Sequence, residues 1–575
     1  MMDQRRALFP FSIDRKIVFF LMAACALAYC SLAYELILAK LIAEMTGNPL
    51  LWENLSMGSF LLGLGARSLV EKPSGHRGAF RELIHTEICI ITAMVVSVLA
   101  IFGAEIFYRI YIYSDGSGRS LWPFPPVWLL GGLSQLAPFW VGWLSSFELL
   151  FFLHFKNGTF IQRQEAKVLA TYHLGALVAT LTFPYVLLKS WSPVEMAGSV
   201  ALINFALLTS LWVFFRKNIV KKCDFASNSP SFFSLFMPLA AIVLMFFLSP
   251  SVERLSRKNF YHNRLSWVFD TRGIYDYRQP IGYWDLMPAM KTKPDVERIR
   301  TPYQVIDVIR EPKESEDQRG ASAGALHING RFQIDTNTSR QYHEPMVHVA
   351  MGLWHEPRQR VLILGGGDGA LARELRRYDA TIKEAVLVDI DAQMIRLAKT
   401  EPFLRQINGD ALSWPKLNVV VGDAMSYLRQ KGTLFDAIFL DLTYPYEFDS
   451  VRFYSVEFFR LMKSRLGPSG FFVLGSPVDL IGSEHSKWRD ILYSTVHAAG
   501  YSEQIAVNGK LDHFLIASTR QLESAPSVET LRILVAGDTS FIHDVQVKRL
   551  SRKIRKDLIN SVMRPQSLGV EDTFF

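Results

Sequence analysis

The chain has 575 residues, of which 50% are hydrophobic and 20% charged, and its formal net charge is +8. This composition excludes a disordered polymer and disfavours a purely water-soluble protein. In such a chain the excess of Lys and Arg is typical of cytoplasmic loops, and no nucleic-acid partner is expected. The cysteines form no C-x-x-C pair and support neither a zinc site nor a disulfide framework; they are Cys25, Cys30, Cys89 and Cys223.

Seven long apolar stretches lie within the first 250 residues. About 20 apolar residues in a helix cross the hydrocarbon core of a bilayer. We therefore expect a multi-pass α-helical domain over residues 1–250, in contact with the lipids of the plasma membrane. We interpret the fourth stretch, which contains Pro138, as one kinked span, because it is too short for two passes. The stretches are about 17–43, 51–70, 84–112, 124–154, 166–189, 193–215 and 232–249.

Three carboxylates accompany these stretches: Glu35 lies within the first, and Glu44 and Glu53 lie near stretch ends. A carboxylate at membrane depth marks a functional site by default, such as a site for a cation or an amine. The alternative role for Glu35 is a helix–helix hydrogen bond, and the sequence favours neither.

Residues 251–300 are expected to form a connector, which either follows the membrane interface or simply joins two domains. From about Thr301 the chain alternates strands and helices. The segments "YQVIDVI" and "ALHINGRFQID" predict strands of a small β domain over 301–350, with Asn-Gly at the turn of a hairpin.

A second domain is expected over residues 351–520. The segments "RVLIL", "EAVLVDID", "LNVVVGDA", "FDAIFLD" and "FFVLGSP" predict strands separated by helices, which is the pattern of a parallel sheet. Residues 521–575 are expected to form a C-terminal helical extension. Its basic run "VKRLSRKIRKDL" either touches anionic lipid or, as we favour, forms a solvated helix face.

The strongest local signal is the glycine-rich segment "VLILGGGDGA" at residues 361–370. Its glycines allow a tight turn and a close approach of a ligand to the backbone. Asp389 ends the next strand, where a carboxylate binds both hydroxyls of a ribose. A strand before the loop and a helix after it favour an adenosine-containing ligand over a purely structural turn. The glycines are Gly365, Gly366, Gly367 and Gly369.

Asp368 within this loop disfavours a dinucleotide, because its charge repels a pyrophosphate at the helix N-terminus. It suits a ligand with positive charge near its adenosine, and S-adenosylmethionine and its decarboxylated form both fit. Asp423 and Asp441 end the third and fourth strands, at the edge where open α/β sheets bind ligands. In the upstream segment, His343 and His348 lack the i, i+4 spacing of a zinc pair, so we expect no metal.

Residues 301–519 resemble the spermidine synthase family, the polyamine aminopropyltransferases. The matching segments are "TPYQ", "INGRFQID", "YHEPMVH", "VLILGGGDGALARELRRY", "LVDID", "VVVGDAMSYL" and "FDAIFLD". Residues 17–70 also resemble the start of the membrane domain fused to some bacterial members. The resemblance implies a small β domain and a Rossmann-like methyltransferase fold. It also implies decarboxylated S-adenosylmethionine as co-substrate, methylthioadenosine as by-product and a small-molecule amine as acceptor. A homodimer is a separate expectation.

The resemblance assigns the donor site residue by residue. Gln304 and Asp389 would hold the nucleoside, and Asp423 and Ala424 the adenine, beside the loop 365–367.

The reacting groups are assigned in the same way. His343 and Asp368 would meet the amino end of the aminopropyl group or the product, Asp441 would accept the proton, and Tyr342 would orient the amine. A carboxylate beside an alkylammonium can take its proton as the C–N bond forms.

The acceptor site departs from the family pattern. Members carry D-x-x-D after the fourth strand, but here Tyr444 replaces the second acid, and Gly475 stands where a glutamine is expected. Glu447 or Asp449 could replace the lost carboxylate, and Gln333 is a further acceptor-site candidate. Besides an enzyme making a polyamine, the sequence allows a transferase with a lipid-soluble acceptor, and a polyamine transporter or sensor.

The predicted orientation conflicts with this chemistry. Most loop Lys and Arg lie on the side of the N-terminus, which places that end in the cytoplasm. Seven spans then place the C-terminal half outside, whereas a cytoplasmic donor requires it inside. Either the span count differs by one, or the domain is extracytoplasmic and its donor supply is unexplained.

Overall fold

The chain folds as two compact units, Met1–Val296 and Glu297–Phe575. The computed structural model describes residues 15–46, 49–70, 79–112, 131–154, 165–187, 191–218, 232–262, 267–269, 275–277, 293–310, 323–353, 356–430, 432–445, 448–481, 486–509, 512–520, 545–551, 554–563 and 565.

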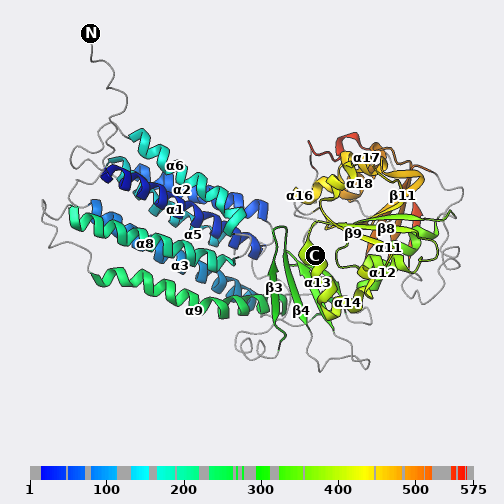
Figure 1. Cartoon of the computed structure of the whole chain (residues 1–575), viewed down its shortest axis with the longest axis horizontal. Helices are drawn as coiled ribbons and strands as arrows, with labels where there is room; N and C mark the ends of the chain where they lie inside the picture. Colours follow the sequence, from blue (N-terminus) through cyan, green and yellow to red (C-terminus); the bar gives the residue numbers. More distant parts are fainter. Residues whose placement is uncertain are drawn as a thin grey trace, which may run out of the picture. The chain divides into compact units, whose positions relative to one another are not determined.

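A bundle of long helices makes up the first unit (Figure 1). One helix occupies each apolar stretch predicted from the sequence, and a short π-helix (Phe183–Leu187) extends the fifth. The helices are α1 (Arg15–Thr46), α2 (Pro49–Val70), α3 (Ala79–Ile112), α5 (Leu136–His154), α6 (Glu165–Thr182), α8 (Pro193–Asn218) and α9 (Phe232–His262).

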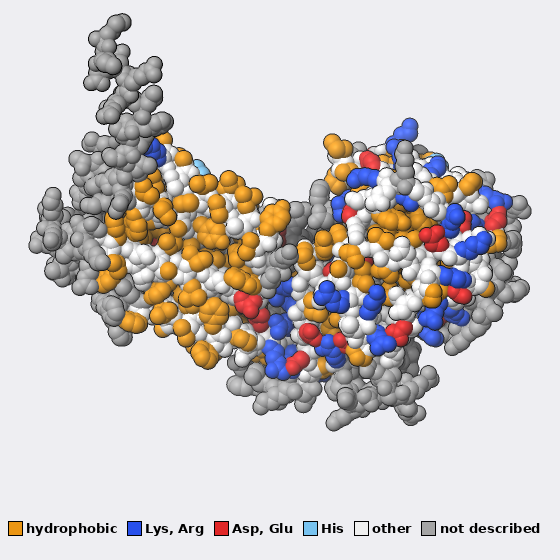
Figure 2. Space-filling model, in the orientation of Figure 1, with side chains coloured by type: hydrophobic (Ala, Val, Ile, Leu, Met, Phe, Trp, Pro, Cys, Tyr) orange, Lys and Arg blue, Asp and Glu red, His pale blue; other side chains and the backbone are white. Residues whose placement is uncertain are grey.

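Five helical segments among the described residues are long and apolar enough to cross a membrane. Hydrophobic side chains cover the visible face of this unit, whereas Lys, Arg, Asp and Glu are frequent on the second unit (Figure 2). An apolar exterior of this kind suits a lipid environment. The segments are Val18–Glu44, Glu82–Ala104, Ala166–Leu187, Pro193–Phe214 and Phe236–Tyr261.

Helices α2 and α5 are not among these five, and glycines bring their backbones together. A Cβ at Gly63 would lie 2.1 Å from the carbonyl oxygen of Phe139, and one at Gly142 would lie 2.0 Å from that of Phe60. No larger side chain fits at either position. Small residues at the contact are the usual means by which membrane helices pack closely.

In the fourth stretch, a helical turn at 131–134 is interrupted at Gln135 before α5 begins, which is consistent with one kinked span; residues 124–130 lie outside the described residues. The expected connector is revised. Helix α9 continues to His262, so it occupies the start of the predicted connector. Two short antiparallel strands, β1 (Trp267–Phe269) and β2 (Tyr275–Tyr277), also fall within that connector.

The second unit contains a four-stranded sheet in the order β3-β4-β5-β6. Asn329 and Gly330, with φ of 50° and 77°, form the turn between β5 and β6. Two successive positive φ angles match the right-handed twist of a hairpin, which confirms the predicted Asn-Gly turn. The strands are β3 (Val296–Arg300), β4 (Val305–Arg310), β5 (Gly324–Ile328) and β6 (Arg331–Asp335).

A larger sheet of eight strands has the order β14-β12-β13-β11-β10-β7-β8-β9. Neighbouring strands from β11 to β9 are parallel, and those from β14 to β11 are antiparallel. The five predicted parallel strands are confirmed. The strands are β7 (Arg360–Gly365), β8 (Glu384–Asp389), β9 (Leu417–Val421), β10 (Phe435–Asp441), β11 (Leu466–Ser476), β12 (Glu503–Asn508), β13 (His513–Ser518) and β14 (Gln546–Arg549).

Helices cover both faces of this sheet. On β7, Val361 and Ile363 join one apolar core, which includes residues of α11, α12, α13 and α14. Leu362 and Leu364 face the other core, which includes residues of α15, α17 and α18. Burial on both faces is what makes the parallel strands continuously apolar in sequence. The helices are α11 (Ser339–Gly352), α12 (Ala370–Arg376), α13 (Ala392–Thr400), α14 (Pro402–Asn408), α15 (Ala424–Arg429), α17 (Val456–Lys463) and α18 (Lys487–Ala498).

The C-terminal segment differs from the sequence expectation. Strand β14 and one turn of 3-10 helix (Lys556–Leu558) occupy the described part of the segment 521–575, where a helical extension was predicted. Lys548 and Arg549 lie on β14 at the edge of the sheet, where basic residues commonly protect a strand from pairing with another chain.

Candidate active site

Four neighbouring strands, in the order β10-β7-β8-β9, bring the predicted residues to one edge of the large sheet. The glycine-rich loop follows β7, Asp389 ends β8, Asp423 follows β9, and Asp441 ends β10. The carboxyl ends of parallel strands share one edge, so residues far apart in sequence meet there.

The loop after β7 requires glycine for two reasons. Gly365 and Gly366 have φ of +83° and +67°, which disfavours other residues. A Cβ at Gly365 would also lie 2.1 Å from the carbonyl oxygen of Asp441, and the Gly366 amide donates to that oxygen at 3.0 Å. The loop is therefore bound to the end of β10, close to the Asp441 side chain.

Asp389 lies on the other side of this loop. Its Oδ2 accepts from the Gly367 amide at 2.9 Å, and its Oδ1 accepts from the Asp391 amide at 2.8 Å. Burial raises the pKa of Asp389 to about 6, although these two hydrogen bonds oppose the rise.

The remaining nucleoside candidates have internal partners. Gln304 donates to Asp391 at 2.8 Å rather than to Asp389. Asp423 caps helix α15 by accepting from the Ser426 amide at 2.8 Å, and its other oxygen lies 3.3 Å from Arg452. Ala424, buried at the start of α15, follows directly.

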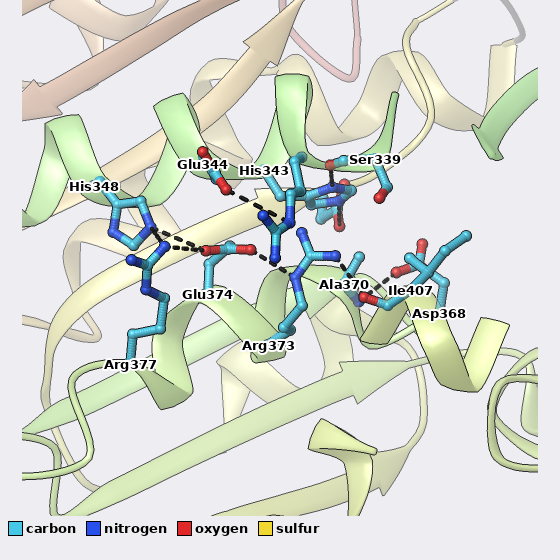
Figure 3. A network of polar contacts seen from close by, with 12 residues as sticks. Ser339, His343, Glu344, His348, Asp368, Ala370, Arg373, Glu374, Arg377 and Ile407 are labelled. Carbon is cyan, nitrogen blue, oxygen red and sulfur yellow. Dashed lines mark hydrogen bonds and ion pairs between the residues drawn. The ribbon is translucent and has the colours of Figure 1, made fainter. Parts of the chain in front are cut away.

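The central feature is a cluster of His343, Asp368 and Asp441, whose side chains each place a ligand atom within 4.8 Å of the others. The Nε2 of His343 lies 3.5 Å from Oδ2 of Asp441. Its Nδ1 lies 2.7 Å from the Ser339 carbonyl oxygen. Figure 3 marks this contact with a dashed line. A carbonyl only accepts, so Nδ1 carries a hydrogen and Nε2 faces the carboxylate. That contact is favourable only with a proton, or another positive group, between them.

The electrostatics of the cluster agree with this geometry. Burial alone would lower the pKa of His343, but Asp441, with a smaller contribution from Asp368, raises it above its ordinary value. Burial and the neighbouring Asp441 raise the pKa of Asp368. One imidazole and two carboxylates can hold either an ammonium group or a metal ion, although the sequence predicted no metal.

Tyr342 and Tyr444 lie near each other beside Gly475. A Cβ at Gly475 would lie 2.5 Å from the Tyr342 hydroxyl and 3.2 Å from Cε1 of Tyr444, so both rings reach this glycine. The ring of Tyr342 packs edge-on against His343 and Phe514, with centroids 4.9 and 5.1 Å apart. Gly475 therefore leaves room for two tyrosines at the position where the resemblance led us to expect a glutamine.

Asp512 is a carboxylate that the sequence analysis missed. It precedes β13 and interacts electrostatically with His343 and Tyr342. Burial raises the pKa of Asp512 to about 6. No motif marks this residue, because only the antiparallel pairing of β13 with β11 brings it to the site.

Of the other acceptor candidates, the structure describes only the side chain of Gln333. Gln333 lies on β6 with an exposed side chain. Glu447 lies outside the described residues, as does the side chain of Asp449.

A buried polar network connects α11, which carries His343, to α12 (Figure 3). Glu374 on α12 lies 2.9 Å from Nε2 of His348, 2.6 Å from Nε of Arg373 and 3.4 Å from Nη1 of Arg377. The Nδ1 of His348 lies 2.9 Å from the Tyr378 hydroxyl. Despite burial, His348 and Arg373 lower the pKa of Glu374 to about 2. The charged network holds the two helices together and so positions His343.

Comparisons with known proteins identify the family of the chain. The model of the family "Spermine/spermidine synthase domain" matches residues 339–495. A polyamine aminopropyltransferase of Mycobacterium tuberculosis (strain CDC 1551 / Oshkosh) is 30% identical over 495 residues, covering 84% of this chain and 81% of that protein. Polyamine aminopropyltransferase 1 of Streptomyces coelicolor is 27% identical, covering 84% and 79%. A spermidine synthase structure from Thermotoga maritima has 20% identity and a TM-score of 0.35, covering 43% of this chain and 82% of that one.

The match to the Mycobacterium protein is longer than the whole segment 297–575, so it extends into the helical unit. Both units of the chain therefore have counterparts in one relative, and His343, Asp368 and Asp441 lie within the residues that the family model matches. The chain belongs to the polyamine aminopropyltransferase family.

Proposed function

We propose that the protein is a multi-pass enzyme of the plasma membrane that transfers the aminopropyl group of decarboxylated S-adenosylmethionine to an amine and releases methylthioadenosine. The observation that carries this proposal is the convergence of His343, Asp368 and Asp441 beside the loop after β7. The five apolar helices support the membrane location.

The donor occupies the edge of the sheet between β10 and β9. Asp389 binds the ribose hydroxyls, and Asp423 and Ala424 flank the adenine. Gln304 orients the loop after β8 through its hydrogen bond to Asp391. Asp368 meets the terminal ammonium of the aminopropyl group. A donor that keeps its carboxylate would place a third carboxylate beside Asp368 and Asp441, which disfavours S-adenosylmethionine.

The transfer itself needs a free amine. Asp441 accepts a proton from the acceptor ammonium, and the exposed lone pair attacks the carbon bound to the sulfonium. As the C–N bond forms, the C–S bond breaks and its electron pair returns to sulfur, giving neutral methylthioadenosine. The sulfonium is a good leaving group, so alignment by Tyr342 and His343 supplies much of the remaining rate enhancement.

The acceptor side lacks the second acid of the family motif, and Asp512 offers a substitute. Its carboxylate lies near both Tyr342 and His343, so it can hold the second ammonium of a diamine. Tyr444 contributes only a phenol and a ring face, which bind an ammonium more weakly, at about 0.5–1 kcal/mol. If Asp512 does not play this role, the pocket favours an acceptor with one amine and an apolar tail.

Calorimetry on the full-length protein tests the donor assignment. We expect tighter binding of decarboxylated S-adenosylmethionine than of S-adenosylmethionine, and a smaller difference in Asp368→Asn. Glu356→Gln, a surface change in the same unit, serves as the control variant. Equal or reversed affinities in the unmodified protein would contradict the proposal.

A further inference from the structure

A second group of buried acidic side chains lies inside the helical unit. Glu87 on α3 and Glu148 on α5 have exposed fractions of 0% and 1%. The sequence analysis singled out Glu35 and passed over this pair, which only the packing of the helices brings together. The two carboxylates lie close enough to influence each other's charge.

The partners of the two carboxylates are unequal. Ser31 on α1 donates its hydroxyl to Glu148, with distances of 3.2 and 3.1 Å to the two carboxylate oxygens. Neither oxygen of Glu87 accepts from a donor among the described residues in hydrogen-bond geometry. Glu87 therefore places its two oxygens beside Glu148 and Asn204, in the interior of the bundle, without a well-placed donor.

Two more buried oxygen atoms belong to the group around Glu87. Asn204 on α8 and Tyr34 on α1 both interact with Glu87, and their exposed fractions are 1% and 0%. The Asn204 Oδ1 and the Tyr34 hydroxyl have no hydrogen-bond partner among the described residues. Buried polar atoms are nearly always paired in native proteins, so four unpaired oxygens in one cluster call for a ligand.

The charge of the cluster indicates the sign of that ligand. Among the described residues, no Lys, Arg or His forms an ion pair with Glu87 or Glu148. Two neighbouring carboxylates in a medium of low dielectric constant cannot both remain charged without a positive partner. Carboxylate, amide and hydroxyl oxygens are ligands for hard cations, and they also accept the N–H groups of an ammonium.

We infer that Glu87, Glu148, Asn204 and Tyr34 form a binding site for one compact cation inside the helical unit, either an inorganic ion or the ammonium group of an amine. Ser31 orients Glu148 toward this site. The inference does not depend on the chemistry of the second unit. It gives the helical unit a binding role of its own, besides anchoring the enzyme.

Ligand-dependent unfolding of the full-length protein in lipid nanodiscs tests the site. Sodium chloride is titrated against choline chloride in one arm, and putrescine at constant ionic strength in the other. We expect a saturable rise in unfolding temperature in one arm, which identifies the source of the cation. A ligand that binds only the folded state raises this temperature with its concentration.

Variants then assign the effect to the site. Glu87→Gln and Glu148→Gln should each increase, at least tenfold, the cation concentration needed for half of the rise in unfolding temperature. Glu195→Gln is the matched control, because Glu195 lies on the same unit and Gln can still accept from the Ser192 amide. Asp441→Asn should keep the putrescine response if that response arises in the helical unit. No response in either arm, or a full response in both glutamine variants, overturns the inference and leaves a shared proton as the partner of the pair.

Discussion

Replacing Gly475 with alanine should impair use of the amine without affecting the donor. The new Cβ would lie 2.5 Å from the Tyr342 hydroxyl, whereas non-bonded atoms normally stay about 3.5 Å apart. The hydroxyl must therefore move by about 1 Å. His343 and Phe514 pack against the ring, with centroids 4.9 and 5.1 Å away, so the ring cannot move without disturbing them.

The expected size of the effect follows from this displacement. Overpacking a filled site costs about 1–3 kcal/mol, and a misplacement of about 1 Å in an active site can cost on the order of 10²-fold in rate. We expect kcat/KM for the amine to fall by about 10²-fold. Donor affinity should stay unchanged, because Asp389 is held by the Gly367 and Asp391 amides, whereas the new Cβ meets only Tyr342 and Tyr444.

Steady-state release of methylthioadenosine at varied amine concentration measures this effect, with calorimetry for donor affinity. Gly467→Ala is the matched control, because Gly467 lies on the same strand and its Cβ would have no neighbour closer than 3.7 Å. Unchanged kcat/KM in Gly475→Ala would refute the placement of Tyr342 in the acceptor site. A loss of donor affinity would refute the separation of the donor site from the acceptor site.

Four further outcomes are expected. Asp441→Asn should lower kcat by about 10²–10⁴-fold in the methylthioadenosine assay while calorimetry still detects the donor, and substantial remaining activity would exclude Asp441 as the base. Donor affinity should weaken as the pH falls through about 6, where Asp389 becomes protonated, and Asp389→Asn should remove this dependence. The folded-state pKa of Glu374 is about 2, against an ordinary 4.5, which corresponds to about 3 kcal/mol of stability. This stability is present above about pH 4.5 and is lost as the pH falls toward 2. Glu374→Gln should therefore lower the unfolding temperature at neutral pH, and an unchanged unfolding temperature would show that the network contributes little. Asp512→Asn should raise KM for diamines more than for monoamines, and an equal change for both would remove its role at the far ammonium.

The parallel part of the large sheet was predictable because local signals and burial agree there. Strand β7 is apolar on both faces, a glycine loop follows it, and α12 comes next. The Asn329-Gly330 turn carried its own conformational preference. In each case a few neighbouring residues determine the structure.

The C-terminal strands were harder to predict. Strand β12 is buried along its whole length and shows no alternation, and a short apolar run does not distinguish a strand from a helix. Strand β14 carries Lys548 and Arg549, whose charge suggested a solvated helix. Its assignment depends on pairing with β12, which is distant in sequence.

The same distinction applies to the active site. Asp389, Asp423 and Asp441 were found because each follows a predicted strand. Asp512 was missed because it belongs to no motif. Glu374 lies within a matching segment, but it was missed because it acquires its partner His348 only through tertiary packing.

The most direct test of the account is amine-dependent turnover by the full-length protein. Purified enzyme is incubated with decarboxylated S-adenosylmethionine or S-adenosylmethionine and a panel of monoamines and diamines, and methylthioadenosine and the modified amine are quantified by mass spectrometry. We expect equal amounts of methylthioadenosine and aminopropylated amine, formed with the decarboxylated donor and lost in Asp441→Asn. A methylated amine formed from S-adenosylmethionine, or no product from either donor, would contradict the account.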